Sequence, residues 1–160
     1  MSFRFGATTS DYVAATNGLS IGATTRTALV CGWWKPTTLT AGRALWSAGS
    51  SGLWSAEVHS TTDELILRGD HATTDSTSTT SGVDLAVDVW TFLAFMVKSN
   101  NTGPLSSWTV WRGSPEVGPV EVTVTAGTAP VGNPAGQTSL HIGNKGTGTS
   151  AFQGDIADVA

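Results

Sequence analysis

Apolar and polar residues alternate along most of the chain with a period of two, which is typical of half-buried β-strands. The apolar segments are rich in Val, Ile, Trp and Phe, and clusters of Gly, Pro, Asn and Ser separate them. One run is apolar at nearly every position, which predicts a central strand covered on both faces. The pattern predicts nine strands, with that run first: residues 27–35, 43–47, 53–59, 64–68, 90–98, 107–112, 120–125, 139–143 and 152–159.

Two segments depart from the strand pattern. Residues 83–89 have helix-like content, but the segment is too short and too β-branched to predict a helix. Residues 72–82 consist mostly of Thr and Ser, and we expect a surface loop or a polar edge strand there. We expect neither half of the chain to close a hydrophobic core alone, and we therefore interpret residues 1–160 as a single domain. Its predicted class is all-β, a two-sheet antiparallel sandwich or jelly roll.

Composition narrows the class of partners. The chain is 39% hydrophobic and contains seven Trp, which excludes a disordered chain, and its net charge is only −4. The eight Lys and Arg are scattered, so we expect neither nucleic-acid binding nor attraction to an anionic membrane surface. No apolar stretch approaches the roughly 20 residues of a membrane-spanning helix, and we therefore expect no membrane insertion.

The single cysteine and the first residues bear on where the protein is made. Cys31 excludes an internal disulfide, and we expect a buried, unreactive side chain within an apolar strand. The first residues lack the basic and apolar segments of a signal peptide. We therefore expect synthesis in a cytoplasm and, for a role outside the cell, a route other than classical secretion.

Three segments, in order, resemble the concanavalin A-like jelly roll, specifically its laminin-G-like group. The first is Ala-Leu-Val-Cys-Gly-Trp-Trp-Lys-Pro at 28–36 with the strand up to 47, similar to the family's strand, Trp-x-Lys-Pro corner and next strand. The others are 89–97 with its partner 108–112, and 140–144 followed by 152–159. The resemblance implies a jelly roll over most of the chain. The family's closing strand continues further, which implies here either a short edge or residues beyond 160.

No catalytic constellation is visible in the sequence. Hydrolysis of a glycosidic bond needs two carboxyl groups about 5 to 9.5 Å apart, which alternate positions on one strand would supply. The sequence has no such pair. Glu57 and His59 share a strand face, but a solvated face explains them better than catalysis without a second carboxylate. We therefore expect no enzyme activity, with glycoside hydrolase as a remote third alternative.

Metal ligands are sparse as well. The three His residues are isolated in the sequence, and the family's calcium-binding carboxylates do not map clearly onto a loop of this chain. We expect no cofactor. The alternative is a calcium ion at the rim of the sandwich, held by oxygens from Asp70, Asp75, Asp155 and Asp158.

Aromatic rings on the surface are the remaining candidates for a binding site. Trp33 and Trp34 are adjacent and must point to opposite faces, so at most one of them enters the core. Trp108 and Trp111 likewise diverge, whereas Trp46 and Trp90 are expected to pack structurally. For a glycan, we predict Trp54 and Trp111 as stacking platforms, with polar support from Glu57, His59 or Arg112.

Two functions follow from these expectations. The first is a structural or adhesion module on the surface of a bacteriophage virion, as a capsid decoration, fibre or tail appendage, whose partners are other virion proteins and copies of itself. The alternative is a lectin-like module that works alone on cell-surface or environmental glycans. A particle protein should dock through an apolar surface larger than a few hundred Å².

Overall fold

The computed structural model describes residues 2–5, 13–21, 26–40, 42–49, 54–59, 64–99, 107–132, 136–145 and 150–160. Within these ranges all regular structure is β. The strands are β1 (Ser2–Phe5), β2 (Val13–Ile21), β3 (Arg26–Pro36), β4 (Ala44–Ala48), β5 (Trp54–Val58), β6 (Leu65–Gly69), β7 (Ser76–Ser81), β8 (Thr91–Ser99), β9 (Ser107–Gly113), β10 (Val120–Ala126), β11 (Gln137–Ile142) and β12 (Gly154–Ala157).

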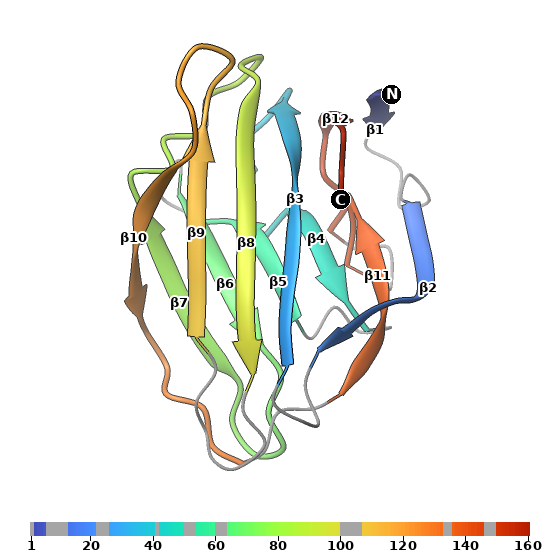
Figure 1. Ribbon diagram of the computed structural model, residues 1–160, viewed down its shortest axis with the longest axis vertical. Coiled ribbons are helices and arrows are strands. Elements are labelled where there is room, and N and C mark those ends of the chain that lie inside the picture. The colour runs from blue at the N-terminus through green and yellow to red at the C-terminus, as the bar shows by residue number, and fades with distance from the viewer. Residues whose placement is uncertain are drawn as a thin grey trace.

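The strands form two layers that face each other (Figure 1). Sheet A runs in the order β1-β12-β3-β8-β9-β10, and sheet B runs β10-β7-β6-β5-β4-β11-β2. Strand β10 belongs to both, because Val120–Val122 pair with β9 while Thr123–Ala126 pair with β7. All the pairs between named strands are antiparallel. The predicted all-β jelly-roll class is therefore confirmed.

A cluster of aromatic rings fills the space between the sheets. From sheet A come Trp34, Phe95 and Trp108, and from sheet B come Trp46 and Trp54. The ring of Trp46 lies 6.0 Å from that of Phe95 and 5.7 Å from that of Trp108, centroid to centroid, so the contacts join the two layers. Burying rings of this size stabilises the sandwich by roughly 1.5–3 kcal/mol each, which makes this cluster a main source of its stability.

The predicted strands are found with shifts of a few residues at their ends. Residues 83–89 are irregular, as expected, with Val83 and Leu85 in the core and left-handed backbone at Asp84 and Asp88. Sequence patterns missed β1 and β2. Residues 72–75 lie between strands, as expected of a loop. The expectation of a loop or edge strand is wrong for the rest of the segment, because β7 lies inside the sheet between β6 and β10.

The last residues of the chain extend along β3 beyond β12. The backbone N–H of Cys31 donates to the carbonyl of Ala160, and the N–H of Ala160 donates to the carbonyl of Cys31, both at 2.9 Å. Gly32 permits this approach, because a Cβ there would lie 3.0 Å from a methyl of Val159. The closing segment therefore pairs with β3 up to residue 160.

Candidate functional site

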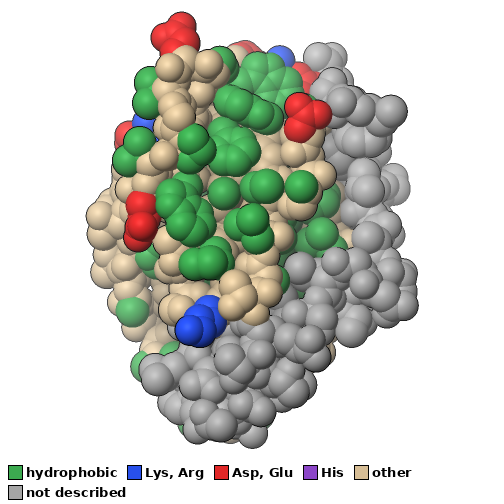
Figure 2. Space-filling model, in the orientation of Figure 1, with side chains coloured by type: hydrophobic (Ala, Val, Ile, Leu, Met, Phe, Trp, Pro, Cys, Tyr) green, Lys and Arg blue, Asp and Glu red, His purple; other side chains and the backbone are tan. Residues whose placement is uncertain are grey.

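The outward side of sheet A carries an apolar surface that no other part of the described chain covers. Its members alternate along three neighbouring strands, and we call them the open face: Leu29, Cys31 and Trp33 of β3, Phe92, Ala94 and Met96 of β8, and Trp111 of β9. Figure 2 shows hydrophobic side chains gathered in the middle of this side of the molecule. Leu29 is 55% exposed, although it lies in the middle of a central strand.

Strand register brings these side chains into rows. Trp33 is opposite Phe92, Cys31 is opposite Ala94, and Leu29 is opposite Met96. The next strand extends the middle row, because Trp111 is opposite Ala94. The neighbours in sequence point inward: Val30 and Trp34 are buried in the core. The open face is thus the second apolar side of strands whose first side builds the core.

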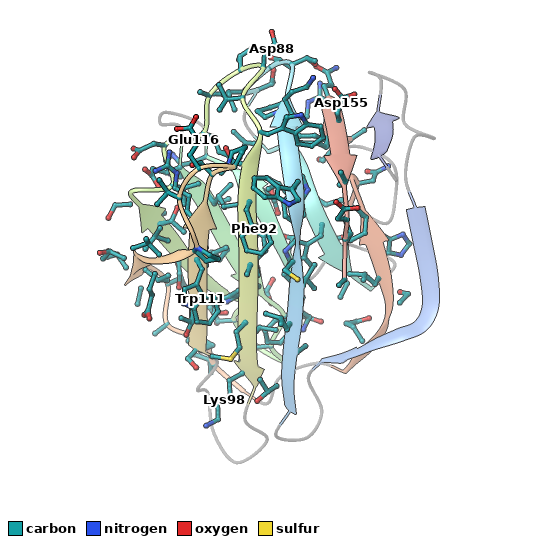
Figure 3. The ribbon with its side chains drawn as sticks, turned by 45° about the horizontal axis from the view of Figure 1, so that its top comes forward. Asp88, Phe92, Lys98, Trp111, Glu116 and Asp155 are labelled. Atoms are coloured by element: carbon teal, nitrogen blue, oxygen red, sulfur yellow. The ribbon has the colours of Figure 1, made fainter. Side chains whose placement is uncertain are left out.

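The two ends of the open face differ in charge. Lys98 lies at one end of β8, while Asp88, Glu116 and Asp155 lie around the other end (Figure 3). The Asp155 carboxylate pairs with the ammonium of Lys35 at 2.7 Å, and that ammonium also lies 5.4 Å from the centre of the Trp90 ring. Asp88 and Glu116 are exposed, so the acidic end carries net negative charge.

A hollow marks the acidic end of the open face. It has a volume of about 320 Å³ and lies between the rings of Trp33 and Phe92 and the turn at residues 113–119. The two rings meet edge to face with 5.5 Å between their centroids. Pro115 and Val117 line the opposite wall. The hollow is therefore an apolar depression that an apolar side chain from a partner could enter.

The expectation that β3 is covered on both faces is wrong. Only its inward side is buried, and Leu29, Cys31 and Trp33 remain exposed or half-buried. Cys31 is accordingly a free thiol on the open face and not the fully buried side chain that its apolar neighbours predict. The expected divergence of the tryptophan pairs is confirmed, since Trp34 is buried and Trp33 lies on the open face.

The five residues predicted for a glycan do not form one site. Trp54 is fully buried beside the rings of Trp108 and His71, so the expectation of a surface ring there is wrong. Glu57 and half-buried His59 belong to the β5 segment of sheet B, whereas Trp111 faces outward from sheet A. Glycan binding by this chain stays a prediction, and among these rings only Trp111 is on the surface.

Arg112 is next to Trp111 in sequence and therefore points to the other side of β9. Arg112 lines a groove of about 500 Å³ where β10 crosses from one sheet to the other, together with Gly82 and Glu121. The groove and the open face lie on either side of the turn at residues 113–119. Arg112 thus cannot support a ligand that stacks on Trp111.

Glu57 is held in an ionic cluster on the outward side of sheet B. It is 2% exposed, and its Oε1 lies 2.8 Å from Nζ of Lys145 and 3.2 Å from Nε of Arg68. The hydroxyl of Ser55 donates to the same oxygen at 2.5 Å. Both cations and the hydroxyl satisfy one buried carboxylate, so the arrangement is one that stabilises structure. Near it on β11, burial lowers the pKa of His141.

The four Asp residues considered for calcium are divided between the sheets. Asp70 and Asp75 flank the β6–β7 turn of sheet B, and Asp155 and Asp158 belong to the β12 end of sheet A. Burial, followed by the charge of Asp75, raises the pKa of Asp70. Among the described residues no three His, Cys, Asp or Glu side chains gather as metal ligands would. A calcium ion bound by all four together is therefore not what this fold arranges.

Comparisons with known proteins place the fold. No protein-family model matches the chain, and no curated protein matches it either. Among the described segments none is a helix long and apolar enough to cross a membrane. The solved structures that resemble the chain include the mouse laminin alpha1 chain, domains LG4-5, with a TM-score of 0.60 and 12% sequence identity. That likeness covers 99% of this chain but only 40% of the laminin chain. The protein therefore has the laminin G-like, concanavalin A-like jelly-roll fold.

Proposed function

We propose that this chain is a non-enzymatic structural and adhesion module of an assembled particle, displayed on a phage virion as a capsid decoration, fibre or tail appendage. In this proposal the open face attaches the module to its neighbours, which are other particle proteins or further copies of the chain. The rest of the surface is rich in small polar side chains and poor in charge, with 12% charged residues overall, and it would face the medium.

The open face is the observation that carries the proposal. Three strands at about 4.8 Å spacing and three rows at about 6.7 Å spacing cover about 300 Å², and apolar side chains hold seven of the nine positions, with Thr109 and Gly113 at the other two. Apolar patches of about 300–600 Å² are the largest on typical monomers and are often functional. Solvent exposure of this area costs stability, whereas docking would recover it, so the face is best explained as an attachment surface.

A lectin-like module is the second candidate, and one observation favours it. The open face carries half-buried Trp33 and Trp111, and indole rings on a surface stack on the apolar faces of sugars. On β8 between them, Phe92 is opposite Trp33 and Ala94 is opposite Trp111, so the small Ala94 leaves room above the sheet beside the Trp111 ring. The same rings serve protein docking equally well, so the two candidates must be separated by measurement.

The experiment combines a glycan array with light scattering on the purified chain. We expect no binding to free glycans at micromolar concentration. We also expect the open face to bind a hydrophobic dye, and this binding should be lost in Leu29→Ser. Val131→Ser is the matched control, because Val131 is 50% exposed but lies away from the open face, beside Thr74. Micromolar glycan binding by a monomer, abolished by Trp111→Ala, would overturn the proposal and establish the lectin.

A further inference from the structure

We infer that the open face pairs with the open face of a second copy of this chain, with the strands of the two copies antiparallel. This inference rests on the proposed function, because it names the occupant of the attachment surface. Two stacked sheets related by a two-fold axis need that axis to lie in the plane between them. The axis can then run along the strands or across them, and the two choices place different groups in contact.

The charges at the two ends of the open face distinguish between the two axes. An axis along the strands would put Lys98 of one copy on Lys98 of the other, and the acidic end on the acidic end. An axis across the strands puts Lys98 of each copy on the other copy's acidic end, where Asp88 and Glu116 are exposed. Opposite charges then meet at both ends of β8. Like charges meet at the β10 edge, where Glu121 is opposite Trp111 in register and lies near the axis. The charge layout therefore favours the antiparallel pairing.

The rows of the open face fit the same axis. The middle row, which holds Cys31, Ala94 and Trp111, lies halfway between the two outer apolar rows. With the axis over this row, Met96 of one copy lies over Phe92 of the other, at the mouth of the hollow beside that ring. A flexible thioether against an aromatic ring is a favourable contact. Ala94 on the axis lets the layers approach at the centre, and the Trp111 rings of the two copies meet each other on the β9 side.

The area is sufficient for a dimer. Strands β9, β8, β3 and β12 lie side by side in sheet A, and β8 has nine residues. At about 4.8 Å per strand and about 3.3 Å per residue, the outward side of these four strands measures about 19 by 30 Å, or about 570 Å². A specific interface needs about 500 Å² on each partner, and standard ones bury about 800 Å². An apolar centre with a charged rim is the usual anatomy of a protein interface, and at the lower end of the size range we expect a weak dimer.

Sedimentation equilibrium tests the occupant. We expect the wild-type chain to change from monomer to dimer between about 1 and 100 µM. Leu29→Ser should raise the dissociation constant at least about tenfold, while the control Val131→Ser should leave it unchanged. Lys98→Glu should weaken the dimer, and adding Glu116→Lys in the same chain should restore it, with both effects shrinking in high salt. A chain that stays monomeric at every concentration overturns the inference.

Cross-linking tests the orientation. An axis across the strands brings the two Cys31 thiols face to face over sheets about 10 Å apart, within reach of a bismaleimide with a spacer of about 8 Å. We expect rapid cross-linking of wild type and none of Leu29→Ser at the same concentration. A dimer that does not cross-link, and whose dissociation constant is unchanged by Lys98→Glu, would overturn the antiparallel pairing. A chain that stays monomeric and binds no glycan would overturn only the inference of pairing between copies. The proposed attachment to another particle protein would still stand.

Discussion

Replacing Glu57 by Gln tests whether the ionic cluster of sheet B is structural. The side chain keeps its size and an oxygen that can accept the hydrogen bond from Ser55. It loses the charge that holds Lys145 at 2.8 Å and Arg68 at 3.2 Å. Removing one partner of a fully buried ion pair costs about 3–5 kcal/mol, because the other charge remains buried. Here the cations are 23% and 41% exposed and can recover water, so we expect a loss of about 2 kcal/mol.

Urea denaturation followed by tryptophan fluorescence measures this loss. Glu121→Gln is the control, because Glu121 is an exposed acid of β10, and its removal should change the free energy of unfolding by less than about 0.5 kcal/mol. Lys145→Met in both backgrounds gives the coupling energy, which we expect to reach about 1 kcal/mol. A loss below about 0.5 kcal/mol for Glu57→Gln would refute the structural role and make the carboxylate a candidate for ligand binding.

Four further substitutions test the core and the titrating groups. Trp54→Ala should cost about 3–5 kcal/mol in urea unfolding, because a fully buried ring is lost, while half-buried Trp111→Ala should cost far less. Burial and Asp75 raise the pKa of Asp70 above 3.8, so its contribution to stability falls as the pH rises through that raised pKa; Asp70→Asn should raise Tm at pH 7 but not below about pH 4. Burial lowers the pKa of His141 below 6.5, so stability is lost as the pH falls below 6.5, and His141→Gln should flatten Tm against pH from about pH 7 to about pH 5.

The fold could be predicted because its strands alternate clearly, and the exceptions have physical causes. In β7 the buried hydroxyl of Thr80 accepts from the backbone N–H of Leu65 and donates to the carboxylate of Glu64, at 2.9 and 2.8 Å. Hydroxyls that satisfy neighbouring strands in this way allow a Thr-rich segment to lie inside a sheet. The sequence shows such residues as polar and does not show which strands they pair with.

The candidate site was only partly predictable. Trp54, Ala56 and Val58 alternate with Ser55 and Glu57, and this alternation was enough to place the Trp54 ring on the apolar side of β5. The prediction of a surface ring relied instead on the Gly-rich turn that precedes Trp54. The open face had a signal as well, because alternate positions of two strands, 29 to 33 and 92 to 96, are apolar on the side opposite the core. Which strands lie side by side is a long-range property, so the sequence could not show that these positions join into one surface.

The contrast between β10 and β3 shows that apolar side chains do not cover every outward strand face of this chain. The inward positions of β10 are Val122 and Val124, which pack against the core, and its outward positions are Glu121, Thr123 and Thr125, which are exposed. The same chain therefore solvates a strand face with polar β-formers where water is the neighbour. On β3 the equivalent outward positions hold apolar and aromatic side chains, the composition of a strand between two layers. The described chain supplies one of those layers, and a docking partner is the simplest source of the other.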